Sequence, residues 1–163
     1  MGALVVAVDV SQERLDKLKT FGVSLALRPD RLDAKALKQT VRDFARQQGV
    51  PSFRHKIFET SGTVAGQGAA FSLLGPGGYL SIVGFTPKPV EVRLSNLMAF
   101  DAIAQGNWGC LPEHYPAIVD LVLAGKVAIA PFVEKRPLAS INQTFADLHD
   151  HKVSGRIVLI PER

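Results

Sequence analysis

An acidic residue ends the first apolar run of the chain, and it is the side chain with the clearest chemical meaning. Val5 to Val8 form a β-branched run typical of a buried parallel strand, and Asp9 and Ser11 follow it. In dinucleotide folds, an acid at the end of the second strand accepts a hydrogen bond from a ribose 2′-hydroxyl. The alternative is that Asp9 only caps the helix that follows. The sequence therefore offers Asp9 as a ribose ligand or as a helix cap.

If Asp9 binds a ribose, the cofactor is expected to be NAD, because a 2′-phosphate would meet an unpaired negative charge. Arg14 and Lys17 lie within reach of the same ribose, although helix-surface cations are usually only solvated. A G-x-G-x-x-G loop would precede such an acid by roughly 20 residues. No such loop stands before Asp9, so we expect the first strand and the glycine loop of a dinucleotide fold to be absent.

Two further segments follow predicted strands and could approach a flat ring. They are ETSGT, which contains Thr60 and Ser61, and VGFT, which contains Val83, Gly84 and Phe85. Doubly wound sheets bind ligands at the carboxyl ends of their strands. Glycine after a strand is also ordinary turn chemistry, so both interpretations remain open. No G-x-S-x-G or phosphate-loop motif supports a hydrolase or a nucleotide triphosphatase.

No metal site is expected from the side chains that ligate metals. These side chains are His55, His114, His149, His151 and Cys110. Their spacing does not bring three or four ligands together, and a single cysteine excludes an internal disulfide. Surface or capping roles are favoured for the histidines.

The composition indicates one ordinary soluble globular domain. The chain has 163 residues, 47% of them hydrophobic and 21% charged, with a net charge of +4. Its cations are spread along helical stretches, as at Lys35, Lys38, Arg42 and Arg46, which favours a solvated helix face over a binding patch. A mild attraction for anionic cofactors or acyl-CoA remains open. We expect no nucleic-acid partner, no membrane segment, no signal peptide and a cytoplasmic location.

Strands and single helices alternate over the first two-thirds of the chain. Apolar runs predict strands within residues 5–8, 23–27, 55–62 and 79–85, and helical spacing predicts helices over 11–20, 33–48 and 64–74. Asp33 is expected to cap the second helix, and Ser11 is expected to begin the first. This alternation predicts an α/β fold with one doubly wound, Rossmann-like parallel sheet.

The last third of the chain is less regular. Residues 94–105 fit a helix or a strand, and residues 115–126 fit a helix. A short strand is expected at 132–138, a helix at 140–149 with Ile141, Phe145 and Leu148 facing inward, and a last strand at 155–161. We expect a partial NAD-binding domain over residues 1–153 and a terminal strand and tail over 154–163.

Four motifs give the sequence a family resemblance. The segments VVAVDVSQERL, GPGGYLSIVGF, GNWGC and GRIVLIP, in this order, resemble the cofactor domain and tail of zinc-type medium-chain alcohol dehydrogenases. Residues 90–116 and 132–138 look like dehydrogenases that oxidise a cyclic hydroxyacyl-CoA of the 6-hydroxycyclohex-1-ene-1-carbonyl-CoA type with NAD. The resemblance implies that the chain is the carboxyl-terminal half of such an enzyme, inactive by itself.

The resemblance also implies a cofactor role for ten residues. It places Asp9 and Arg14 on the adenosine ribose, and Thr60 and Ser61 on the adenine side. On the nicotinamide side it places Val83, Gly84 and Phe85 against the ring and the backbone of Asn107 and Trp108 on the carboxamide. It places Arg156 on a phosphate or ribose. The catalytic zinc ligands and the proton relay of the family would lie in the absent part. No catalytic residue and no metal ligand is therefore expected here.

Two other classes of function remain open. The chain could be a non-catalytic α/β module that binds nucleotide weakly or associates with other chains, or an S-adenosylmethionine-type nucleoside binder. VGFT and GNWGC make more sense around a nicotinamide than around S-adenosylmethionine. Because an unfilled central sheet position exposes strand edges, self-association is expected, most simply as a homo-oligomer.

Overall fold

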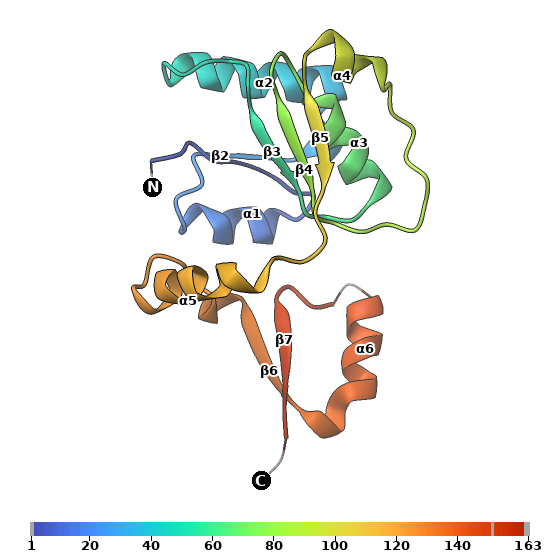
Figure 1. Cartoon of the computed structure of the whole chain (residues 1–163). Coiled ribbons are helices and arrows are strands. Elements are labelled where there is room, and N and C mark those ends of the chain that lie inside the picture. Colours follow the sequence, from blue (N-terminus) through green and yellow to red (C-terminus); the bar gives the residue numbers. More distant parts are fainter. Residues whose placement is uncertain (1, 151, 162–163) are drawn as a thin grey trace. The chain divides into compact units, whose positions relative to one another are not determined.

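The backbone of the protein divides into two compact units. The computed structural model describes residues 2–150 and 152–161, and the units are Met1–Gly109 and Cys110–Arg163 (Figure 1). The expected division after residue 153 separates a partial NAD-binding domain from a terminal strand and tail, and it remains a prediction. Each unit is described separately below.

Strands and helices alternate through the first unit as the apolar pattern predicts. Its elements, in chain order, are β1 (Val6–Val8), α1 (Gln12–Lys19), β2 (Leu25–Leu27), α2 (Ala34–Gln47), β3 (Lys56–Glu59), α3 (Val64–Ser72), β4 (Tyr79–Ile82), α4 (Ser95–Ala99) and β5 (Ile103–Gly106). Residues 94–105, which fit helix or strand by pattern, contain both α4 and most of β5. The α/β class with parallel strands is confirmed.

Side-chain oxygens fix where the long helices of this unit begin. The Ser11 hydroxyl accepts the Arg14 amide at 3.3 Å before α1, and the Asp33 carboxylate accepts the Ala36 amide at 2.7 Å before α2. These caps satisfy backbone donors that no helix carbonyl can reach. The predicted Asp33 cap is confirmed, and Ser11 caps the first helix. None of the described helices is long and apolar enough to cross a membrane.

The strands of the first unit form two parallel sheets rather than one. In the first sheet β1 pairs with β2, and in the second β4 lies between β3 and β5. Among the described residues no ladder joins β1 to β3, which is where the sequence leads us to expect an unfilled central position of the doubly wound sheet.

A small core lies between α3 and the second sheet. Ala70, Phe71 and Leu74 at the end of α3 pack with Leu80 of β4, and each of the four is at most 8% exposed. Partly buried side chains of β3 and β5 surround them, including Ile57 and Ala104. This packing fixes α3 against the strands whose carboxyl ends form the candidate site.

The second unit pairs two parallel strands, β6 (Val133–Pro137) and β7 (Arg156–Ile160), and also contains α5 (Tyr115–Leu123) and α6 (Ile141–His149). In α6, Phe145 is 62% exposed and Leu148 is 44% exposed, and Ile141 is also exposed. The expectation that these three side chains face inward is therefore wrong. Thr144 is the buried residue of α6, at 4% exposure. Helical spacing identifies an apolar face, but it does not identify what covers that face.

We expect Leu80→Ala to lower the free energy of unfolding by about 2–5 kcal/mol, because it leaves a cavity beneath α3. Leu80 is 2% exposed. The matched control is Leu94→Ala in the same unit, at a side chain that is 68% exposed, and it should change stability by less than about 1 kcal/mol. Urea unfolding measures both variants. Equal effects of the two substitutions would contradict the placement of this core.

Candidate functional site

The second sheet brings three groups of predicted site residues to one edge. The Val83 amide donates to the Glu59 carbonyl at 2.9 Å, and the Asn107 amide donates to the Ile82 carbonyl at 2.9 Å. Because β3, β4 and β5 are parallel, their carboxyl ends lie side by side. The structure therefore brings together the residues that follow these ends, which are Thr60, Ser61, Val83, Gly84, Phe85, Asn107 and Trp108.

A buried carboxylate organises the turn after β3. Glu59 is 4% exposed, and its Oε1 accepts the Ser61 amide at 2.8 Å, the Ser61 hydroxyl at 2.6 Å and the Gly62 amide at 3.2 Å. Its Oε2 has no hydrogen-bond partner among the described residues. No individual role was predicted for Glu59, although an acid at the end of an apolar strand was the available signal.

The turns after β3 and β4 touch through their glycines. A Cβ on Gly84 would lie 2.2 Å from the Gly62 nitrogen and 2.7 Å from Glu59 Oε2, so only glycine fits there. Gly62 has a φ of +62°, and a Cβ there would lie 2.6 Å from the Phe85 carbonyl oxygen. Gln67 of α3 donates a hydrogen bond from its side-chain Nε2 to the Gly84 carbonyl at 2.9 Å. The two turns therefore form one prearranged surface.

Large apolar side chains stand exposed at this edge. Val83 is 52% exposed, Phe85 75% and Trp108 95%. Exposed aromatic and aliphatic groups beside close-packed glycines form a surface that a flat, partly apolar ring can cover. The exposure of these side chains agrees with a ligand-facing position.

The end of β5 is held in place by a side-chain hydrogen bond. Asn107 donates from its Nδ2 to the hydroxyl oxygen of Ser81 at 2.7 Å, and Ser81 is 6% exposed. Because the Asn107 amide already donates to the Ile82 carbonyl, it is not free to bind a carboxamide. The predicted backbone contact with a carboxamide would therefore be made by the Asn107 carbonyl or by the Trp108 backbone.

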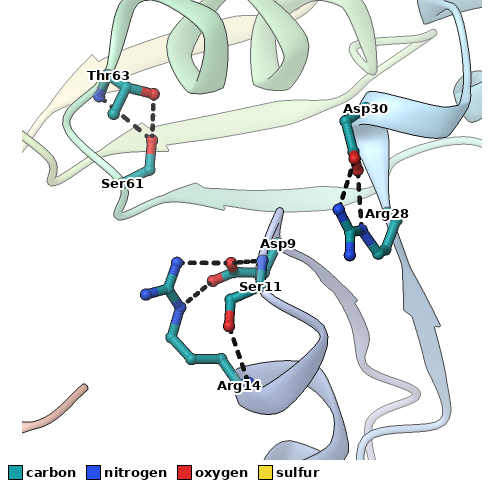
Figure 2. A network of polar contacts seen from close by, with 7 residues as sticks. All are labelled: Asp9, Ser11, Arg14, Arg28, Asp30, Ser61 and Thr63. Carbon is teal, nitrogen blue, oxygen red and sulfur yellow. Dashed lines mark hydrogen bonds and ion pairs between the residues drawn. The ribbon is translucent and has the colours of Figure 1, made fainter. Parts of the chain in front are cut away.

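The Asp9 carboxylate lies at the carboxyl end of β1 and is paired with Arg14. Arg14 donates from Nε to Oδ2 at 2.9 Å and from Nη2 to Oδ1 at 2.8 Å, as Figure 2 shows. Oδ1 also accepts the Ser11 amide at 2.7 Å. The Ser11 hydroxyl, and not Asp9, caps α1 at the Arg14 amide. A second, separate pair joins Arg28 and Asp30 after β2 (Figure 2).

The environment of Asp9 keeps its carboxylate charged. Partial burial alone would raise the pKa of Asp9, but the hydrogen bonds from Arg14 and from the Ser11 amide outweigh it and lower the pKa below its ordinary value. The Arg14 pKa is correspondingly raised by the hydrogen bond to Asp9. At neutral pH the pair therefore presents a negative acceptor that is held by a fixed cation.

Two expectations concern residues away from this edge. Arg156 begins β7 in the second unit, opposite Val133, so its predicted contact with a phosphate or ribose remains a prediction. The described residues contain no group of three or more His, Cys, Asp or Glu side chains that could hold a metal ion. Their donor set therefore does not fit a zinc ion.

The comparisons with known proteins agree with this geometry. Residues 1–124 match the family model described as zinc-binding dehydrogenase. An alcohol dehydrogenase from Geobacillus stearothermophilus is 28% identical over 160 residues, which are 98% of this chain and 44% of the relative. The chain thus spans less than half the length of that relative.

Solved structures share the fold. The alcohol dehydrogenase from Aeropyrum pernix superposes with a TM-score of 0.80 at 27% identity, covering 98% of this chain and 43% of that chain. An alcohol dehydrogenase from E. coli CFT073, solved with NADH bound, superposes with a TM-score of 0.73 at 15% identity, over 96% of this chain and 44% of that chain. At such low identity the second likeness concerns the fold alone.

We expect Gly84→Ala to destabilise the first unit by about 1–3 kcal/mol, because the added methyl group would meet backbone of the neighbouring turn. The matched control is Gly106→Ala at the end of β5, where nothing lies within 4 Å of the added Cβ. Thermal unfolding compares the two variants. If Gly84→Ala proved as stable as Gly106→Ala, the close contact of the two turns would be refuted.

Proposed function

Because this chain belongs to the zinc-binding dehydrogenase family, we propose that its first unit binds NAD along the carboxyl ends of β1 and of the β3–β5 sheet. The observation that carries this proposal is the prearranged edge built by Glu59, Gly62 and Gly84. It agrees with the general position of ligands in open α/β sheets. The role is that of a cofactor-binding part of an alcohol dehydrogenase.

Asp9 would hold the adenosine ribose. A carboxylate offers about four lone-pair positions, and three of those on Asp9 are filled by Arg14 and the Ser11 amide. One position on Oδ2 remains, which is sufficient for one ribose hydroxyl while the ion pair stays intact. Binding of a second hydroxyl would require Arg14 to release an oxygen. Thr60 and Ser61 would lie on the adenine side.

The turns after β4 and β5 would orient the nicotinamide. When bound, that ring supplies the hydride acceptor of the oxidation. The chain's own contribution is to position it: Val83 and Phe85 offer apolar contact and shield one face from water, and Gly84 allows close approach of backbone. Because the described donors do not fit zinc, no acid, base or metal step is assigned to this chain.

A non-catalytic association module is the alternative function. The observation in its favour is the division of the first unit into two sheets, since β1 and β3 each have one unpaired edge among the described residues. In that case the ribose acceptor and the prearranged turns would be retained without measurable cofactor affinity.

We also propose a cyclic hydroxyacyl-CoA as the substrate class of the whole enzyme. This proposal is supported only by the sequence resemblance over residues 90–116 and 132–138. Measuring the affinity for NADH with and without a saturating concentration of such a thioester checks it, because a bound acyl chain next to the nicotinamide should tighten or loosen NADH binding. An unchanged NADH affinity would count against this substrate. Homo-oligomerisation and a cytoplasmic location remain predictions.

Calorimetric titration with NADH tests the cofactor proposal. We expect saturable binding, with Asp9→Ala weakening it roughly 10- to 100-fold through the loss of a hydrogen bond to a charged acceptor. The matched control, Asp16→Ala on the exposed face of α1, should leave NADH affinity unchanged. NADPH and S-adenosylmethionine serve as comparison ligands. Absence of NADH binding would favour the association module.

The pH dependence follows from the lowered pKa of Asp9. A carboxyl group whose folded-state pKa is depressed stays ionised at neutral pH and gains its proton only as pH falls through that lowered value. The Asp9 contribution to NADH affinity should therefore be constant between about pH 5 and pH 8. An Asp9-dependent loss of affinity within that interval would contradict the environment described for this carboxylate.

A further inference from the structure

A small recess in the first unit is lined by cationic side chains and lies away from the cofactor edge. Lys38 and Arg42 contribute from α2, and Arg54 and His55 contribute from the segment just before β3, together with Ser52. His55 precedes the first residue of β3, whereas Glu59 ends that strand. The recess and the cofactor edge therefore lie at opposite ends of β3.

No acidic side chain lines this recess. In the part of the chain that the structure describes, Arg42 and Arg54 form no ion pair, whereas Arg46, one turn further along α2, pairs with Asp43 at 3.1 Å. Some other surface arginines, such as Arg14 and Arg28, do have a carboxylate partner. The positive charge of the recess is thus uncompensated by the chain itself.

Lys38 is held in place rather than solvated, contrary to the expectation of a plain helix face. Its ammonium donates to the carbonyls of Ser72, at 3.0 Å, and Leu74, and it lies 5.1 Å from the centre of the Phe100 ring. These contacts complete the end of α3 and fix a cation at the back of the recess. Lys38 therefore contributes charge, while the guanidinium groups of Arg42 and Arg54 form no ion pair among the described residues and the His55 ring donates to the Pro51 carbonyl.

The backbone holds Arg54 in an uncommon conformation. Its φ is +57°, in the left-handed region that few non-glycine residues adopt, and its amide donates to the Pro76 carbonyl at 2.9 Å. A Cβ on Gly77 would lie 2.8 Å from Arg54 Cγ, so the absence of a side chain at Gly77 makes room for the arginine stem. Arg54 is thus positioned next to His55 by its local fold.

The electrostatics of the recess favour a negative guest. Burial lowers the pKa of His55, and the nearby charges of Arg42 and Lys38 lower it further, while a hydrogen bond to the Pro51 carbonyl opposes them. Burial and Arg42 also lower the pKa of Lys38. Neighbouring cations repel one another and so lower one another's pKa values. An anion that binds between them offsets this repulsion.

We propose that this recess is a binding site for an oxyanion of the phosphate type, held by Arg42, Arg54 and His55. The space has room for about one water-sized group. One oxygen of a tetrahedral oxyanion fits that volume, while the outer oxygens reach the arginine guanidinium groups, which bind such oxygens in pairs. The ligand is inorganic phosphate or a phosphoryl group carried by a larger molecule.

Proton NMR of the histidine rings tests the site with inorganic sulfate as the probe, because the charge of sulfate does not change over the range in which histidine titrates. Sodium chloride at the same ionic strength is the comparison, and His55→Gln assigns the resonance. A bound anion favours the imidazolium, so sulfate should raise the titration midpoint of His55 by roughly half a pH unit or more. The other histidines should not respond.

Arg42→Gln and Arg46→Gln form the matched pair of variants on α2. Arg42→Gln should weaken sulfate binding at least about tenfold, and Arg46→Gln should leave it unchanged. An equal effect of chloride, or an equal loss in both variants, would overturn the proposal by showing general screening. A His55 midpoint that does not move in the wild-type protein would also overturn it. Titration with phosphate and with a phosphate monoester then distinguishes the two sources of the ligand.

Discussion

The buried carboxylate of Glu59 is the interaction on which the candidate site depends. A charge that is 4% exposed is tolerated only when it is hydrogen-bonded, and Glu59 meets that need with the amides of the turn that follows it. Those bonds fix Gly62, and the position of Gly62 in turn leaves no room for a side chain on Gly84. One acid thereby determines the conformation of two turns that carry five of the predicted cofactor residues.

The division of the first unit into two sheets separates two halves of the candidate site. The ribose acceptor Asp9 belongs to the β1–β2 sheet, whereas the nicotinamide-side residues belong to the β3–β5 sheet. Within each sheet, ladder hydrogen bonds hold the strand ends rigidly in register. No ladder of hydrogen bonds joins the two sheets among the described residues. Binding of a dinucleotide to both edges would therefore add a connection that the backbone itself does not make.

The sequence predicted those strands and helix starts that depend on residues close together in the chain. Apolar runs located β1 to β4, whereas the pattern over β5 fitted either a helix or a strand. Asp33 was predicted as a cap, since a cap needs only the next three residues. The sequence did not predict the exposure of Phe145, because that exposure depends on which distant surface lies opposite the apolar face of α6. Glu59 was missed for a related reason: its partners are near in sequence, but its burial depends on the packing of β4.

The charged side chains near the two ends of β3 differ in the partners that the chain provides for them. At the carboxyl end, amide donors bind Glu59 Oε1 while its Oε2 has no hydrogen-bond partner among the described residues, and Asp9, at the end of β1, is paired with a guanidinium. At the amino end, Lys38 is matched by helix carbonyls, but Arg42 and Arg54 have no carboxylate partner. Uncompensated cations around a half-buried histidine lower stability unless something else binds. The unpaired cations are the physical reason to expect a simple oxyanion at the amino end, whereas the dinucleotide proposed at the carboxyl end is supported by the prearranged turns.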